Sequence, residues 1–240
     1  MGAASDGVNG FKLAKASSVA TFAIESAGAG TSTFAIVASG SGVQILNVSN
    51  PYSLMALGAA SDGVDGFNVL NGANGISVFA ISGSTYAAVS SSLDNGVQII
   101  NVSDPSVPVA VGAATNGVDG FTKLAGASGV ATFAMGASTF AIVTSFQDNG
   151  VQLIDVSDPK KPLAMGTATD GVDGFSMLSG ATGVAVFAIG TSIFAIVASY
   201  DEKGEQDYGV QLISLSDPQK LVAVGAASDG VDGFNALAGA

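Results

Sequence analysis

The sequence predicts an all-β protein, a β-propeller of four four-stranded antiparallel blades. Three observations predict this fold. A string that starts with Gly-Val-Gln recurs at four positions with nearly constant spacing. Short runs rich in β-branched residues lie between these strings, with turn signals at their ends. One run in each unit is apolar at consecutive positions, so it must be covered on both faces, and stacked antiparallel sheets provide that cover.

The repeat unit is about 54 residues long, because successive Gly-Val-Gln strings are separated by 54, 54 and 59 residues. The last interval is longer because the loop Ser199–Tyr208 is enlarged. We interpret residues 1–240 as one propeller domain with repeats at about 15–67, 73–121, 127–175 and 180–234. A second string, Gly-Val-Asp/Asn-Gly-Phe, links the units and is called the connector below. It starts at Gly7, Gly63, Gly117, Gly171 and Gly230.

Each unit contains four predicted strands, which in the third copy are residues 129–135, 138–144, 150–156 and 162–167. Asp148-Asn149-Gly150 marks a tight hairpin loop, and Ser157-Asp158-Pro159 marks a type I turn. The uncharged stretches 127–146 and 181–200 are long enough for membrane helices. Because each contains an internal turn signal and recurs in register with the repeat, we predict hairpins and no membrane insertion.

The composition excludes several classes of function. All seven basic residues are lysine, and Arg, His, Cys and Trp do not occur. The usual zinc, copper and haem sites, Cys nucleophiles and Ser-His-Asp triads are therefore excluded. A net charge of −12 argues against a nucleic-acid partner, because nothing supplies a patch that neutralises phosphates. We predict no cofactor, with calcium as the alternative, since hard oxygen ligands remain.

The strings GVQIINVSDP (Gly96–Pro105) and GVQLIDVSDP (Gly150–Pro159) resemble the LVIVD-repeat propellers of bacterial and archaeal surface or secreted proteins. The resemblance recurs in all four units, although the connector makes each unit longer than the usual repeat. It implies a propeller at the cell surface or outside the cell, with no catalytic residues to transfer. We see no signal peptide and expect a segment of a larger protein. The predicted function is a non-enzymatic module that binds a protein or glycan through a loop rim.

The connector carries two carboxylates or their amide equivalents three residues apart, around glycines that permit a sharp turn. Such oxygens could converge on calcium, which gives the alternative function of a calcium-stabilised scaffold. We favour the simpler interpretation that they cap backbone amides of the loop. The candidate metal ligands are Asp62, Asp65, Asp119, Asp170, Asp173, Asp229 and Asp232.

In an up-and-down sheet, the loop between strands two and three leaves the blade on the same rim as the connector. This end, called the connector rim, is therefore predicted to be acidic, and a basic partner or simple solvation both fit that charge. The enlarged fourth loop alone breaks the repeat, so we place the candidate binding residues there: Asp201, Glu202, Glu205, Asp207 and Tyr208. Gln44, Gln98, Gln152 and Gln211 are predicted to be buried and hydrogen-bonded between blades, with a channel-lining ring as the alternative.

The two ends of the chain repeat one another, because residues 1–16 match residues 225–240 almost position for position. Only one of these copies has a repeat-equivalent place in a closed ring of four blades. We favour closure within one chain, as a monomer, because association of two chains loses entropy. The alternative is a dimer whose two chains form an eight-bladed ring.

Overall fold

The computed structural model describes residues 4–7, 10–26, 28, 30–200 and 208–234. These residues form strands and turns and contain no helix. The strands are β1 (Ala16–Ser26), β2 (Gly30–Ser39), β3 (Gly42–Asn47), β4 (Met55–Ser61), β5 (Ala73–Ile81), β6 (Ser84–Ser91), β7 (Gly96–Asn101), β8 (Val109–Thr115), β9 (Ala127–Met135), β10 (Ser138–Ser145), β11 (Gly150–Asp155), β12 (Leu163–Thr169), β13 (Ala181–Ile189), β14 (Ser192–Ser199), β15 (Gly209–Ser214) and β16 (Val222–Ser228).

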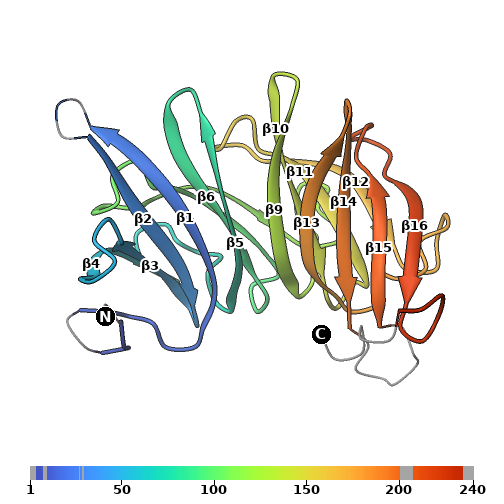
Figure 1. Ribbon diagram of the computed structural model, residues 1–240, viewed down its shortest axis with the longest axis horizontal. Helices are drawn as coiled ribbons and strands as arrows, with labels where there is room; N and C mark the ends of the chain where they lie inside the picture. Colours follow the sequence, from blue (N-terminus) through green and yellow to red (C-terminus); the bar gives the residue numbers. More distant parts are fainter. Residues whose placement is uncertain (1–3, 8–9, 27, 29, 201–207, 235–240) are drawn as a thin grey trace.

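The strands form four antiparallel sheets of four strands, each in chain order, as predicted. The first strands of neighbouring sheets, β1, β5, β9 and β13, pack against one another in sequence and are the innermost strands. Figure 1 shows the four sheets side by side as successive blades. The predicted all-β propeller fold is therefore confirmed, and the strands of the third copy deviate from their predicted bounds by at most two residues at either end.

The two uncharged stretches that are long enough for membrane helices are β-hairpins, β9–β10 and β13–β14. In each hairpin an aromatic pair is stacked across the two strands: Phe133 with Phe140 and Phe187 with Phe194. The described part of the chain contains no helix that is long and apolar enough to cross a membrane.

The apolar core lies between the blades, because neighbouring blades cover each other's faces. Each junction has its own cluster of buried side chains, and a phenylalanine and a leucine from the connector are part of it. At the junction of blades 2 and 3, for example, Phe121 and Leu124 are 3% and 0% exposed. The corresponding pairs are Phe67 with Leu70 and Phe175 with Leu178. The connector therefore contributes side chains to the apolar core as well as linking the blades.

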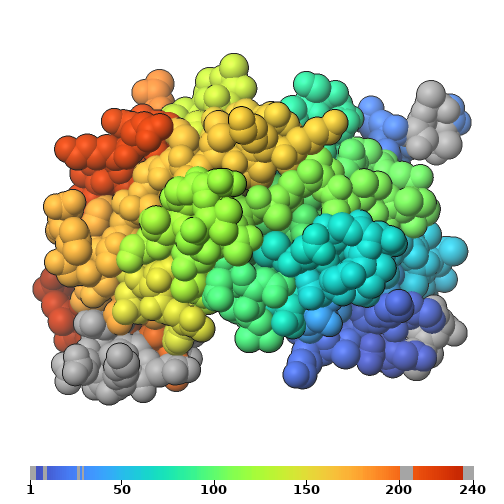
Figure 2. Space-filling view, turned by 180° about the vertical axis from the view of Figure 1, so that it is seen from behind, coloured from blue at the N-terminus to red at the C-terminus, as the bar shows by residue number. Residues whose placement is uncertain are grey.

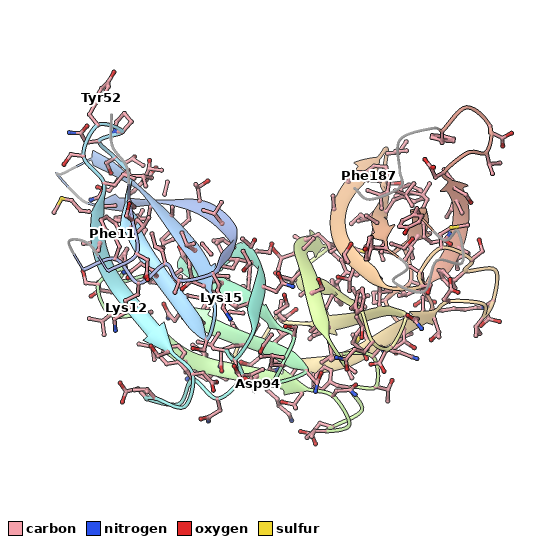
Figure 3. The ribbon with its side chains drawn as sticks, turned by 90° about the horizontal axis from the view of Figure 1, so that it is seen from below. Phe11, Lys12, Lys15, Tyr52, Asp94 and Phe187 are labelled. Atoms are coloured by element: carbon pink, nitrogen blue, oxygen red, sulfur yellow. The ribbon has the colours of Figure 1, made fainter. Side chains whose placement is uncertain are left out.

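The blades form an open arc, which corrects our expectation that four blades close into a ring within one chain. Seen from below in Figure 3, the first and fourth blades stand at opposite ends of a crescent. Among the described strands, no contact comparable to β1 with β5 joins β1 to β13. A ring of four needs a quarter turn per blade, which spreads the outer strands apart. Here the outer parts are held together, since Gly58 N–H donates to Pro105 O of the next blade at 3.0 Å.

Candidate functional site

The four repeated glutamines hold the connectors in place. Gln98 in β7 is 2% exposed, and its Oε1 accepts the backbone N–H groups of Asn68 and Val69 at 3.2 and 3.3 Å. Its Nε2 donates to Gly112 O in β8 at 2.8 Å. Gln44, Gln152 and Gln211 make the same two kinds of hydrogen bond. The glutamines are buried and hydrogen-bonded as predicted, but the expected bond between blades is wrong, because their partners are backbone groups of the connector that enters the same blade and of the fourth strand of the same sheet.

In the four connectors that precede a blade, the first Asp or Asn of the pair caps the end of the connector. Asp62 Oδ1 accepts the N–H of Leu70 at 3.1 Å, and Asp170 Oδ1 accepts that of Leu178 at 2.8 Å. Asn116 does the same for Leu124, so an amide replaces the carboxylate without loss of the bond. This arrangement is the loop capping that we favoured over metal binding.

The second carboxylate of each pair lies at the exposed tip of the connector, in the left-handed backbone region that Asp tolerates better than most residues. These residues are Asp65, Asp119, Asp173 and Asp232, with φ of 51°, 48°, 50° and 50°. Within residues 4–7, 10–26, 28, 30–200 and 208–234, no three acidic side chains cluster closely enough to hold a metal ion.

The connectors and the loops between second and third strands share one rim, as predicted. Asn116 N–H donates to Asn95 O and Asp170 N–H donates to Asn149 O, each at 2.9 Å. Two carboxylates of this rim are engaged in backbone bonds: Asp94 Oδ2 accepts Asn71 N–H at 2.7 Å, and Asp148 Oδ2 accepts Ala125 N–H at 2.8 Å. Asp94 and Asp148 therefore stabilise the fold of this rim, whereas the carboxylates at the connector tips are exposed.

Most of the predicted binding residues lie outside the described residues, namely Asp201, Glu202, Glu205 and Asp207. Tyr208 is described. Its ring meets that of Tyr200 edge to face at 5.6 Å, and its carbonyl oxygen accepts Asp229 N–H at 2.9 Å. Tyr208 thus anchors the end of the enlarged loop to the start of the last connector.

A second break in the repeat occurs at blade 1, and sequence reasoning missed it. The loop between β2 and β3 has two residues, Gly40 and Ser41, whereas the loops after β6 and β10 have four. In addition, Lys15 occupies the position directly before the first strand, where the connectors that precede the other three blades have Gly72, Gly126 and Gly180. A register comparison of the five connectors, and of the four loops that precede the Gly-Val-Gln strings, would have revealed both departures.

The two departures at blade 1 have one geometric explanation. The three glycines and Lys15 all have a left-handed backbone, with φ of 77°, 65°, 58° and 57°. A Cβ atom at Gly72 would lie 2.7 Å from Ser92 Oγ and 2.8 Å from Leu93 N, so the four-residue loop of blade 2 excludes a side chain there. The shorter loop of blade 1 leaves this space open, and a lysine side chain can occupy the position.

A pocket of about 660 Å³ lies at this point, between the first connector and the loops of blades 1 and 2. Its lining includes the ammonium-bearing Lys12 and Lys15, the carboxylate Asp6 and the amides Asn71 and Asn74, with several serines. Figure 3 shows Lys12, Lys15 and Asp94 on the connector rim, which faces the viewer in that orientation. Neither lysine forms an ion pair with a described residue, whereas Asp6 Oδ1 accepts Leu13 N–H at 2.7 Å.

Fold and repeat together define a β-propeller protein built from tandem units. The family model of the LVIVD repeat matches residues 79–115 and 140–170, in the second and third units. The resemblance seen in the sequence is therefore confirmed for these two units, which match the LVIVD repeat. No curated protein matches the sequence.

Solved structures confirm the propeller fold and nothing more specific, since their identity to this chain is low. A periplasmic gluconolactonase from Pseudomonas aeruginosa matches with a TM-score of 0.57 and 14% identity, over 87% of this chain and 53% of its own. A functionally unknown protein from Desulfotomaculum acetoxidans matches with a TM-score of 0.55 and 14% identity, over 82% of this chain and 53% of its own. An exo-β-1,3-galactanase from Phanerochaete chrysosporium matches with a TM-score of 0.52 and 9% identity, over 90% of this chain and 50% of its own. The chain spans about half the length of these structures.

Proposed function

We propose that this protein is a non-enzymatic propeller module that binds a partner through its connector rim, at the cell surface or outside the cell. The observation that carries the proposal is the pocket of blade 1, where two lysines without an ion pair to any described residue occur in a chain of net charge −12. Two separate departures from the repeat, Lys15 and the shortened loop Gly40–Ser41, both line it. Binding residues on propellers are expected in such loops, which a rigid scaffold positions.

The chemistry of the pocket favours a sugar acid, that is, a polyhydroxylated ligand with one carboxylate. Lys12 and Lys15 provide the positive charge for the carboxylate, and the serine hydroxyls and asparagine amides match sugar hydroxyls. A volume of about 660 Å³ lies within the range of small-molecule sites. An extended polyanion would place many of its charges close to the acidic surface of the protein and be repelled. A single carboxylate held at the two lysines is affected less, because charges farther away than about 8–10 Å are screened at physiological salt. A single carboxylate on a mainly neutral glycan therefore suits the site better than a highly charged polymer.

The test compares D-galacturonate with D-galactose, which differ in the C6 carboxylate, by calorimetric or NMR titration. We expect galacturonate to bind more tightly than galactose, and the combined change Lys12→Ser and Lys15→Gly to abolish that preference. The fold should survive, since the connector that precedes blade 4 has Ser176 and Gly180 at these positions. Changing Lys160→Ser and Lys161→Ser on the opposite rim removes the same charge and is the matched control. Equal affinity for the two sugars, or loss of binding in the control as well, would contradict the assignment.

The enlarged fourth loop is a second proposed contact region on this rim, with Asp201, Glu202, Glu205, Asp207 and Tyr208 as its candidate residues. Replacing Ser199–Tyr208 by the five residues Ser145–Asn149 of the third copy tests it without changing the strands. We expect weaker binding of a basic protein partner and unchanged folding. If binding persists after the exchange, the loop makes no contribution.

A further inference from the structure

Each junction between blades uses the same outer contact, in which a glycine of the fourth strand receives the turn of the next blade. Gly58 N–H donates to Pro105 O, and Gly166 N–H donates to Pro218 O at 2.8 Å. A Cβ at Gly58 would lie 2.5 Å from Pro105 O, and one at Gly166 would lie 2.9 Å from Pro218 O. Gly112 is in similarly close contact with Pro159. These glycines are required because the neighbouring backbone approaches so closely.

Blade 4 has the same glycine, Gly225, but no turn among the described residues lies against it. Nothing lies within 4 Å of the place where a Cβ of Gly225 would be. The inner contact shows the same asymmetry. A Cβ at Gly75 or Gly129 would lie 2.5 Å from a carbonyl oxygen of the next blade, whereas Gly183 has only Ala198 Cβ, at 3.8 Å. Blade 4 therefore presents one side of a junction, the side that carries the donor Gly225. Neither Gly183 nor Gly225 is in close contact with another blade.

The apolar face of blade 4 is uncovered in the same way. Ile196 in β14 is 37% exposed, whereas Ile36 and Ile142 at the equivalent positions are fully buried. Phe187 is 38% exposed and Phe79 only 8%. Figure 3 shows Phe187 on the fourth blade at the mouth of the arc, across from the first blade. Surface of this kind on a soluble protein marks an interaction site.

Blade 1 has the complementary half of the junction. Val19 in β1 is 61% exposed, whereas Ile76 and Val130, which face the preceding blade, are each 8% exposed. The turn of blade 1 is already formed, because Asn50 Oδ1 accepts Tyr52 N–H at 3.0 Å, just as Asp104 Oδ1 accepts Ser106 N–H at 2.9 Å. Tyr52 in this turn is 79% exposed.

The connector that belongs to the missing junction is also in place on blade 1. Phe11 is 4% exposed and packs with Ala35 and Leu46 of that blade. Phe234, the repeat-equivalent residue of the last connector, is 46% exposed. Of the two duplicated connectors, the first therefore takes the repeat-equivalent position, and blade 1 lacks only a preceding blade.

We propose that a second copy of this chain supplies that blade. Blade 4 of each copy packs against blade 1 of the other, with Gly225 receiving the Asn50–Tyr52 turn, and two such junctions close a ring of eight blades. The second copy is favoured over another partner because this seam continues an interface that the chain already uses three times. Two-fold closure also covers both free halves at once, and the second junction forms within a complex that already exists.

The experiment is light scattering of the purified chain over a range of concentrations. We expect a mass twice 23.3 kDa. Gly225→Leu should give the single-chain mass with an unchanged β-type circular dichroism spectrum, because the added side chain meets open space in the isolated chain but the turn of the partner in the ring. Val19→Asp should do the same from the other half of the seam. Ala137→Leu, on an exposed turn of blade 3, adds bulk away from both ends and should remain dimeric.

Mixing the two monomeric variants gives a specific check. A pair formed from Gly225→Leu and Val19→Asp has one seam with both changes and one seam with none, so the mixture should regain dimer that neither variant forms alone. A mass of 23.3 kDa for the unchanged chain at all concentrations overturns the proposal. So does a larger open polymer, a dimer that survives both changes, or a mixture that stays monomeric. These results do not depend on sugar binding at the pocket of blade 1.

Discussion

Asn149 Oδ1 accepts the backbone N–H of Gly180 at 2.9 Å, across 31 residues of the chain. The bond joins the loop of blade 3 to the connector that enters blade 4, and Asn95 makes the same bond to Gly126. In blade 1, which lacks the Asp-Asn pair, the backbone oxygen of Gly40 receives Gly72 N–H instead. Every internal junction is therefore fastened on the connector rim by a loop of one blade and the connector to the next.

Removing the hydrogen bond of Asn149 should lower the free energy of unfolding. Two substitutions separate the loss of the bond from the cost of the left-handed backbone. Asn149 has φ of 50°, so Asn149→Ala loses the bond and places a Cβ-bearing residue less suited to that conformation. We expect a loss of about 1–2 kcal/mol in the free energy of unfolding for Ala. Asn149→Gly loses only the bond and should cost less, in urea titrations of both variants. If Gly and Ala are equally destabilising, backbone conformation has no part in the effect.

Gln152→Leu should be more destabilising than its similar volume suggests. Gln152 is fully buried, and its Oε1 accepts Thr122 N–H at 3.2 Å while its Nε2 donates to Met165 O at 3.0 Å. Leucine leaves these part-buried backbone groups without their side-chain partner, which costs at most about 1–3 kcal/mol per group. Gln147→Leu, on the exposed loop of the same blade, is the control and should stay within about 0.5 kcal/mol. Similar denaturation midpoints for the two variants would show that the connector does not depend on the carboxamide.

Phe121→Ala should show that the connector is part of the core. Phe121 is 3% exposed in the cluster between blades 2 and 3, so truncation removes apolar contacts and leaves a cavity, at a cost of about 3–5 kcal/mol. Val118 belongs to the same loop and is 51% exposed. Val118→Ala should therefore be nearly neutral in thermal unfolding. A small effect of both changes would mean that the connector is a surface link only.

Calcium should raise the melting temperature no more than sodium chloride of equal ionic strength. The reason is that Asp62 and Asp170 are engaged by backbone N–H groups, while Asp65 and Asp173 lie exposed at the connector tips. Specific binding would instead stabilise the fold in proportion to the logarithm of the calcium concentration. Differential scanning fluorimetry with both salts measures the difference. A calcium-specific rise that Asp65→Asn and Asp173→Asn remove would favour the calcium-stabilised scaffold.

The repeat, the strands and the class of fold follow from the sequence, because they depend on local properties. In the third unit, the Asp148-Asn149-Gly150 loop and the Ser157-Asp158-Pro159 turn set the strand ends within two residues of those observed. The apolar character of β10 on both faces indicated that blades must stack. The burial of the four glutamines was also predictable, because a polar residue repeated in a buried strand needs a fixed partner.

The tertiary structure alone decided how the units meet. Whether Asp62 caps Leu70 or binds a cation depends on the fold of the connector, and the space for Lys15 depends on a loop 25 residues away in the chain. The open arc depends on outer contacts such as Gly58 with Pro105, which limit the turn between neighbouring blades. A sequence pattern specifies which residues repeat and which face inward. The angle between blades is the sum of many contacts between residues far apart in the chain, and no single motif encodes it.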